Sequence, residues 1–313
     1  MKQAVKQKQK KPNRTLHLDL KRNRKRHRRS IIRRRAEYNH KQFRTAFIIC
    51  TAFAMIAVLG LVYVFWNGFE AEKDYERLAS DNVFEDVTEA ANEETTEGWF
   101  GRVPAWNGTG AVLTVDFVRL LSENADTVAW LHVPAADVSY PVVHHAENND
   151  YYLHRAFDGT DSAAGSIYLE YTNTPDFTDR HSLIYGHNMN DGSMFGSLQR
   201  SFHQKDVAEI TETYFYLYLP DGSVNRYYVF SFYETDKDSD TYLTFTEDNA
   251  YDWYVHYAKT ASEAGRNADG TESYPEIFLS RPPIVTLSTC SGPSGTSGRF
   301  VIHGVLTDHL KKR

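Results

Sequence analysis

One uninterrupted apolar run stands out near the N-terminus. Residues 46–66 contain no charged side chain. In a helix, this length spans the roughly 30 Å hydrocarbon core of a bilayer at about 1.5 Å per residue. The run is longer than the apolar part of a cleavable signal peptide, which has about 7–15 residues. It therefore predicts a single transmembrane helix that stays on the chain as a signal anchor.

Short apolar and aromatic runs dominate residues 130–306. Such runs between turn signals are typical of strands, and they occur at 138–143, 166–169, 182–185, 213–219 and 227–233. Residues 220–223, Pro-Asp-Gly-Ser, form a hairpin-turn signal. Segment 247–264 instead has helical spacing, with one apolar face formed by Tyr251, Tyr254, Val255 and Ala258. The pattern predicts a mainly-β, barrel-like domain with one long helix.

Two further runs, 284–290 and 299–306, predict a final strand pair around a loop rich in Gly and Ser. This hairpin would place Cys290 beside Arg299, since opposed cross-strand residues lie roughly 4.5–5.5 Å apart at Cβ. A neighbouring cation favours the thiolate, which is the nucleophilic form of cysteine. A buried structural cysteine beside a surface arginine is the alternative interpretation.

Charge is divided sharply along the chain. Residues 1–45 carry 18 Lys and Arg against Asp19 and Glu37, a net of +16, and the remainder carries −22. Under the positive-inside rule the basic block is cytoplasmic and the bulk of the chain is extracellular. The block lacks interleaved aromatic residues and adjoins the predicted membrane helix. It favours a topology signal that also contacts membrane lipid, and no nucleic-acid partner is expected.

The charge and hydropathy patterns give four regions. They are a basic cytoplasmic tail (1–45), the transmembrane anchor (46–66), an acidic extracellular stalk (67–111) and a folded domain (112–313). The stalk is expected to act as a tether outside the fold. A short helix is expected to start at Thr114, which is a possible cap.

The chain has two cysteines, Cys50 in the apolar run and Cys290 in the outer domain. They cannot pair with each other across this separation, so Cys290 would be a free thiol in an oxidising compartment. Catalysis is the usual reason to retain such a thiol.

A nucleophilic cysteine needs a proton partner, and His187 is the best placed histidine. It follows the apolar strand 183–186 and opens a polar loop, whereas His303 lies within a strand and is expected to be either a packed or an outward-facing histidine. Neighbouring His144 and His145 cannot chelate one ion together in an extended chain. No zinc or calcium spacing is present, so no metal and no cofactor are expected.

These residues closely resemble the signature of the sortase family, class B. The resemblance covers about residues 130–306, and its motifs are Thr286-Leu-Ser-Thr-Cys290 with Arg299 downstream, Tyr185-Gly-His-Asn-Met189, Tyr140-Pro-Val-Val143, Asn149-Asp-Tyr-Tyr-Leu153 and Asp191-Gly-Ser-Met-Phe-Gly196. The chain departs from some class B members at Ser291, where they have an acidic residue.

The resemblance implies an eight-stranded sortase-type β-barrel with N-terminal helices and a helix before the last two strands. It implies a transpeptidase in which Cys290 attacks a sorting motif after Thr, His187 protonates the leaving amine and Arg299 holds substrate carbonyls and the oxyanion. Matching positions imply that Ser288, Tyr185, Asn149 and Leu153 line the substrate groove.

The implied partners are secreted proteins with a C-terminal sorting motif and an acceptor amine from cell-wall precursor. A pilus-polymerising enzyme that uses a pilin lysine is an alternative, and so is a hydrolytic cysteine endopeptidase of the cell surface. A catalytically idle adhesion or scaffold domain is the third interpretation, and the retained cysteine, histidine and arginine argue against it.

Overall fold

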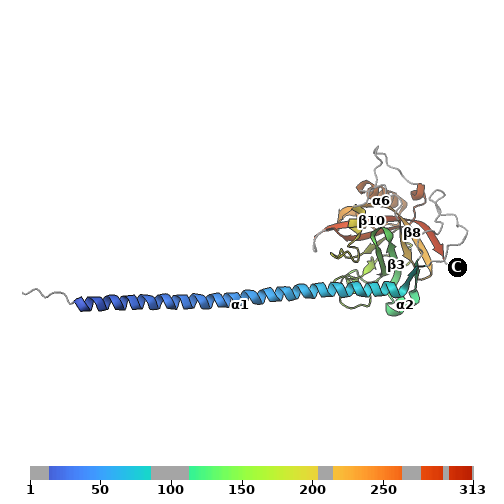
Figure 1. Ribbon diagram of the computed structural model, residues 1–313. Helices are drawn as coiled ribbons and strands as arrows, with labels where there is room; N and C mark the ends of the chain where they lie inside the picture. Colours follow the sequence, from blue (N-terminus) through green and yellow to red (C-terminus); the bar gives the residue numbers. More distant parts are fainter. Residues whose placement is uncertain (1–13, 86–112, 204–213, 263–275, 292–295, 312–313) are drawn as a thin grey trace, which may run out of the picture. The chain divides into compact units, whose positions relative to one another are not determined.

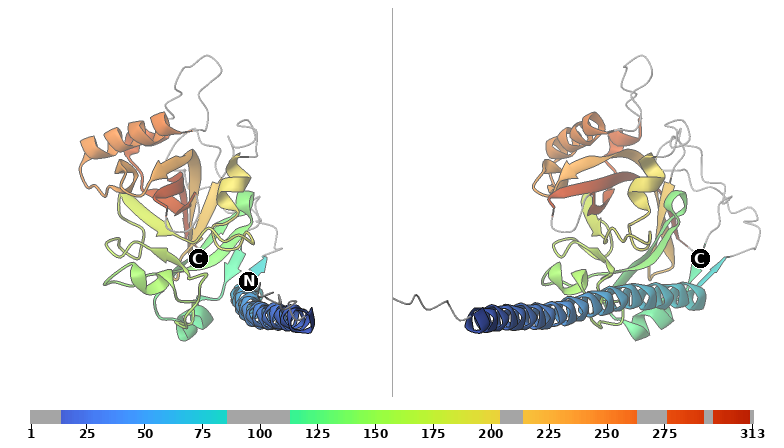
Figure 2. Two further views of the ribbon diagram at one scale, coloured as in Figure 1. Left: turned by 90° about the vertical axis from the view of Figure 1, so that its left-hand side faces the viewer. Right: turned by 60° about the vertical axis from the view of Figure 1, so that its left-hand side comes forward.

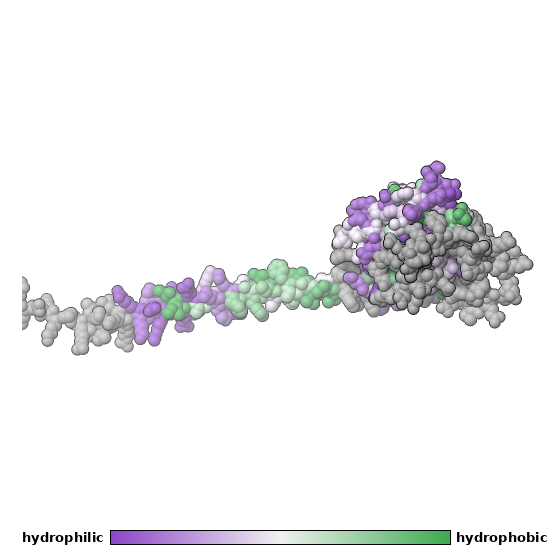
Figure 3. Space-filling model, turned by 90° about the horizontal axis from the view of Figure 1, so that it is seen from above, coloured by the Kyte–Doolittle hydropathy of each residue, from purple (hydrophilic) through white to green (hydrophobic). Residues whose placement is uncertain are grey.

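The computed structural model describes residues 14–85, 113–203, 214–262, 276–291 and 296–311 (Figure 1). The chain separates into two units, residues 1–65 and 66–313. Helix α1 (Arg14–Asn82) supplies the described part of the first unit and continues into the second. Among the described residues, only the segment Arg24–Tyr63 is long and apolar enough to cross a membrane, and none of it is buried. Figure 3 shows its apolar side chains as an exposed surface.

The second unit is built on a closed barrel of eight strands in the order β10-β8-β7-β3-β4-β5-β6-β9. The pairs β4–β5 and β6–β9 are parallel and the others antiparallel. The strands are β3 (Thr127–Val133), β4 (Val138–Val143), β5 (Ile167–Leu169), β6 (His181–Tyr185), β7 (Tyr214–Tyr218), β8 (Ser223–Asp236), β9 (Ile284–Cys290) and β10 (Gly298–Lys311). The predicted barrel is confirmed.

The turn between β7 and β8 has the predicted conformation. Gly222 adopts φ +82°, a left-handed value that glycine takes without steric cost. Its N–H donates to the Leu219 carbonyl at 2.9 Å, and the Asp221 carboxylate accepts from the Ser223 N–H at 2.9 Å.

The barrel separates two apolar clusters. Large side chains such as Trp130, Phe215 and Phe300 are fully buried in the first cluster. The second lies beneath helix α6 (Asp248–Ala261), which packs on β8 and β10 (Figure 2). Its buried side is the predicted face, formed by Tyr251, Tyr254, Val255 and Ala258.

Short helices occupy the connections between strands. They are η1 (Pro134–Ala136), α3 (Asp150–Leu153), α4 (Leu198–His203), η2 (Asp240–Tyr242) and η3 (Glu276–Ser280). Of these, α3 and η2 carry side chains or carbonyls to the candidate site.

The end of α1 packs on the barrel. Tyr75 and Leu78 are each 5% exposed and belong to the main apolar cluster. Strand β1 (Val83–Glu85) then pairs with β2 (Leu113–Val115). This differs from the expectation of a tether outside the fold, because an apolar face recurs along an otherwise acidic helix. Residues 86–112 of the expected stalk lie outside the described part.

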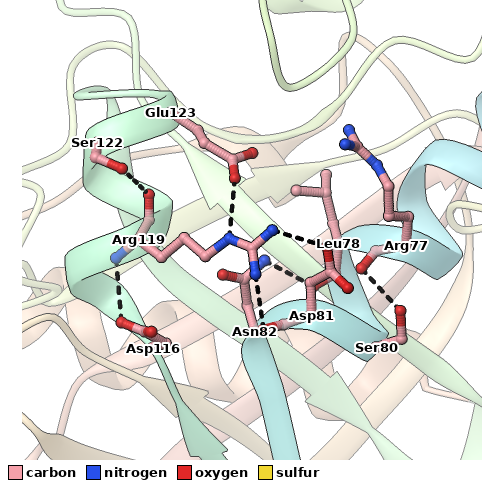
Figure 4. A network of polar contacts seen from close by, with 9 residues as sticks. All are labelled: Arg77, Leu78, Ser80, Asp81, Asn82, Asp116, Arg119, Ser122 and Glu123. Atoms are coloured by element: carbon pink, nitrogen blue, oxygen red, sulfur yellow. Dashed lines mark hydrogen bonds and ion pairs between the residues drawn. The ribbon is translucent and has the colours of Figure 1, made fainter.

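Arg119 on α2 (Phe117–Glu123) ties that helix to the end of α1 (Figure 4). Its Nη2 donates to Asp81 at 2.7 Å and its Nε to Glu123 at 3.3 Å. Helix α2 starts at Phe117, with Asp116 accepting from the Arg119 N–H at 3.1 Å. The expected cap at Thr114 is wrong, because residues 113–115 are drawn into the β1–β2 pair.

Candidate active site

The β9–β10 hairpin brings Cys290 and Arg299 together. The two residues are direct partners in the antiparallel register. Residues 284–289 are buried, whereas Cys290 and Arg299 are half-buried where the ladder ends. Opposed residues of an antiparallel pair project from the same face. The predicted pairing of Cys290 with Arg299 across the hairpin is confirmed.

Parallel pairing with β6 brings His187 to the same end of β9. Tyr185 is the partner of Ser288, and the next residue donates its N–H to the Ser288 carbonyl at 3.2 Å. Continued by two residues beyond the pair of Tyr185 and Ser288, the same register places His187 level with Cys290. Asn188 closes this junction, because its Nδ2 donates to the Cys290 carbonyl at 2.6 Å.

The ring of His187 is oriented by a main-chain carbonyl. Nε2 lies 2.7 Å from the Leu153 oxygen, which can only accept, so Nε2 carries the hydrogen. In the neutral ring Nδ1 is then the atom that exchanges a proton. Burial lowers the pKa of His187, and the hydrogen bond to the Leu153 carbonyl opposes this shift. Charge repulsion from His154, whose ring stacks on His187 with 5.7 Å between centroids, lowers the pKa further.

The guanidinium of Arg299 is anchored to its own hairpin. Nη1 donates to the carbonyls of Thr296 at 3.0 Å and Gly298 at 2.9 Å. Within the described part of the chain, its Nε and Nη2 groups have no hydrogen-bond acceptor. These donors belong to the register partner of Cys290, and guanidinium donors of this kind can stabilise a developing oxyanion.

The four expected groove residues lie around this centre. Tyr185 and Asn149 both donate to the Glu170 carboxylate, at 2.9 and 2.7 Å. The Ser288 hydroxyl is 2.8 Å from that of Tyr242. Leu153 contributes the carbonyl that binds His187. Tyr185 and Asn149 are thus joined through Glu170, Ser288 pairs with Tyr185 between strands, and Leu153 contacts His187.

Three residues of this arrangement were not expected as site residues. Asn188 links the end of β6 to β9 through the Cys290 carbonyl, and the Glu170 carboxylate accepts from Tyr185 and Asn149. The Tyr242 hydroxyl contacts the Ser288 hydroxyl. The position of Asn188 directly after His187 is a signal that could have identified it. Glu170 is a lone carboxylate after an apolar strand. Tyr242 lies on η2, in a connection whose path the sequence pattern does not define.

A buried polar chain crosses the three strands that carry the site. His181 on β6 and His303 on β10 each lie 2.7 Å from the Thr286 hydroxyl on β9. His181 Nδ1 donates to the Leu243 carbonyl at 2.7 Å. Burial lowers the pKa of both histidines, to about 4 for His181. His303 is fully buried, which is the packed one of the two expected alternatives. The part of the chain that the structure describes contains no cluster of side chains able to hold a metal ion.

Comparison with known proteins identifies the family. A model of the Sortase domain family matches residues 131–307, more than half of the chain. The chain is 35% identical over 187 residues to Sortase B of Listeria monocytogenes, covering 58% of this chain and 70% of that protein. The chain belongs to class B of the sortase family.

Solved structures support this assignment. The crystal structure of B. anthracis sortase B in complex with AAEK1 has a TM-score of 0.56 and 26% identity, covering 78% of this sortase and all of that chain. A Streptococcus pyogenes class B sortase involved in pilus biogenesis has a TM-score of 0.51 and 29% identity, covering 61% and 98%. Sortases are cysteine transpeptidases, so this chain is an enzyme of that type.

Proposed function

We propose that this sortase cleaves a C-terminal sorting motif of secreted proteins after Thr and transfers the acyl group to an amine of cell-wall precursor. The observation that carries the proposal is the junction at the end of β9. There Cys290 is the register partner of Arg299, and its carbonyl accepts from the residue that follows His187.

In the first half-reaction the Cys290 thiolate attacks the carbonyl carbon of the Thr–Gly or Thr–Asn bond. The carbonyl oxygen becomes an oxyanion, which the Nε and Nη2 donors of Arg299 stabilise. Collapse of this intermediate breaks the C–N bond. His187, as the imidazolium, gives its Nδ1 proton to the leaving amine, and a thioester on Cys290 remains.

In the second half-reaction an acceptor amine attacks the thioester carbonyl. The C–S bond breaks, an amide forms, and the amine loses a proton to the neutral His187, which restores the starting imidazolium and thiolate. Water in place of the amine gives hydrolysis through the same thioester.

We assign Tyr185, Asn149, Ser288 and Leu153 to the substrate groove. The donors of Tyr185 and Asn149 converge on Glu170, which is 9% exposed, and Tyr242 stacks on Tyr185 with 6.3 Å between ring centroids. Burial and the adjacent Glu170 raise the pKa of Tyr185, so its hydroxyl remains a donor. These contacts favour a preformed wall of defined shape.

The proposed location is the cell membrane, with residues 46–66 as the anchor, residues 1–45 in the cytoplasm and the barrel outside. The apolar segment of α1 and the basic block before it support this orientation. Protease added to protoplasts should degrade the region after Trp66 and spare the first 45 residues.

Mass spectrometry of the intact enzyme tests the reaction. Peptides with a Thr–Gly or Thr–Asn bond should add an acyl group to Cys290, and an added amine should convert this species to an amide product. Release of free acid alone at high amine concentration would favour the hydrolytic endopeptidase. Absence of any acyl-enzyme across a peptide library would contradict the proposal.

A pilus-polymerising role is the second candidate, favoured by the similarity to the S. pyogenes enzyme involved in pilus biogenesis. Competition between a lysine-containing pilin peptide and a cell-wall precursor peptide distinguishes the two roles. Preferential amide formation with the lysine side chain would assign this sortase to polymerisation.

A further inference from the structure

The Leu153 carbonyl that orients His187 is itself held on both sides. It ends α3, a helix of four residues that cannot be rigid alone. The N–H of Ser166 donates to the Tyr152 carbonyl at 3.0 Å, and its hydroxyl donates to the Arg155 carbonyl at 2.8 Å. Ser166 therefore forms hydrogen bonds to the main chain on both sides of Leu153.

Gly165 lies directly against the same carbonyl. It has φ +58°, and a Cβ at this position would be 2.4 Å from the Leu153 oxygen. The close approach explains why glycine occupies the position. Any shift of the Gly165 backbone is therefore transmitted to the atom that binds His187.

Tyr75, on α1, holds this turn from the outside. Its hydroxyl donates to the Gly165 carbonyl at 2.9 Å and lies 3.1 Å from the Ser166 hydroxyl. The side chain is 5% exposed. Burial raises the pKa of Tyr75, so its hydroxyl remains protonated and able to donate.

The ring of Tyr75 also contacts the second support of His187. It packs edge-on against Tyr140, with 5.4 Å between centroids. The Tyr140 hydroxyl accepts from the Met194 N–H at 3.1 Å, and the N–H of the next residue, Phe195, donates to the His187 carbonyl at 2.9 Å. One side chain thus contacts the elements that hold both the ring and the main chain of His187.

We propose that Tyr75 is a positioning residue for His187, so that the helix leading from the membrane anchor is part of the catalytic scaffold. This rests on the proposed role of His187 as the acid. The mechanism is geometric. Without the Tyr75 hydroxyl the turn at residues 165–166 relaxes, and the hydrogen bond between His187 Nε2 and the Leu153 carbonyl lengthens. Because this bond raises the pKa of His187, its weakening lowers that pKa and reduces the imidazolium fraction.

The test follows His187 directly in the full chain, in detergent micelles. Histidine is labelled with ¹³C at Cε1, and the signal is assigned by its loss in His187→Gln. Titrations compare the parent protein, Tyr75→Phe, which keeps the ring, and Tyr75→Ala. Tyr218→Phe is the matched control, because it also removes a buried tyrosine hydroxyl. That hydroxyl accepts from the Leu113 N–H on β2 and not from the turn at residues 165–166.

Tyr75→Phe should shift the His187 titration to lower pH, Tyr75→Ala further, and Tyr218→Phe not at all. With a cleavable peptide, kcat should fall about tenfold at unchanged KM, since small misplacements of catalytic groups are costly. An unchanged His187 titration in Tyr75→Phe would overturn the proposal, even if Tyr75→Ala fails to fold. Lack of turnover in every protein would contradict the proposed function and leave the titration decisive for Tyr75.

Discussion

The two halves of the active site are built in different ways. Cys290 and Arg299 lie on one hairpin and form the end pair of a continuous ladder of seven residue pairs. His187 lies just beyond the end of β6, and its ring is held by a carbonyl from a four-residue helix. The first half depends on local pairing, and the second on contacts between segments distant in the chain. The histidine half should therefore be easier to disturb from outside.

Two connections join the halves. Asn188 binds the Cys290 carbonyl, and the Thr286 hydroxyl links His181 on β6 with His303 on β10. With both histidines neutral, one arrangement of hydrogens accounts for the two contacts of the Thr286 hydroxyl. His303 Nδ1–H donates to Thr286, whose hydroxyl donates to His181 Nε2. The second connection is buried and the first is at the site.

The largest effect is expected for Cys290→Ala. The change removes only sulfur at the end of a strand, so the fold should persist while thioester formation is lost. Mass spectrometry with a cleavable peptide checks this, with Cys50→Ala as the control that keeps activity. Retained transpeptidation by a folded Cys290→Ala protein would show that the cysteine half does not carry the chemistry.

Removal of residues 69–111 should have the next largest effect. A chain that begins at Val112 loses the buried Tyr75 and Leu78 and strand β1. At about 1.5–3 kcal/mol for each buried side chain, its unfolding free energy should be about 4 kcal/mol lower than that of a chain beginning at Phe69. Urea unfolding of the two proteins measures the difference. Equal stabilities would mean that the segment is a tether after all.

Acid should weaken the buried connection. The unfolded chain protonates His181 near its ordinary pKa of about 6.5, whereas the folded protein resists protonation down to about pH 4. Neutral His181 thus contributes about 3 kcal/mol to the unfolding free energy. This contribution is fully present above pH 6.5 and is lost as the pH falls toward 4. His181→Gln should flatten this dependence, measured by urea unfolding between pH 7 and 4.5. The exposed His256→Gln should retain the full slope.

Substitution of the other two catalytic residues should cost about 10²-fold or more in kcat/KM, the scale of losing a general acid or an oxyanion donor. The proteins to compare are His187→Ala and Arg299→Ala. Arg299→Lys should recover only part of the kcat/KM lost in Arg299→Ala, since a lysine ammonium lacks the planar, two-pronged donor geometry of a guanidinium. If His303→Ala were as damaging as His187→Ala at unchanged stability, the assignment of the histidine would be wrong.

The smallest effect is expected for Asn188→Ala. A hydrogen bond between neutral groups contributes about 1 kcal/mol, so kcat/KM should fall about fivefold. Asn190→Ala, in the same loop with an exposed side chain, is the matched control. Equal rates for both variants would show that this junction does not align the two halves.

The sequence is most informative where the structure is local. The runs at 284–290 and 299–306 contain the whole hairpin, so the pattern of residues alone pairs Cys290 with Arg299 correctly. His187 is distinguished by its place after a strand, and the resemblance to sortases strengthens that choice. The buried face of α6 follows from its helical spacing.

The rest depends on contacts that no local pattern contains. The partner of the His187 ring is a main-chain carbonyl, for which every residue type is equivalent. The packing of Tyr75 is hidden in the sequence because acidic neighbours make its segment resemble a stalk. Glu170 and Tyr242 reach the site only through the closure of the barrel.

The position of β10 in the barrel couples the candidate site to the closure of the fold. This strand closes the barrel by pairing with both β8 and β9, and it is the last strand along the described chain. The strand that pairs Arg299 with Cys290 is therefore also the strand that completes the barrel. Local unfolding of β10 would open the barrel and separate the two residues at the same time, so loss of the site and opening of the fold are a single event.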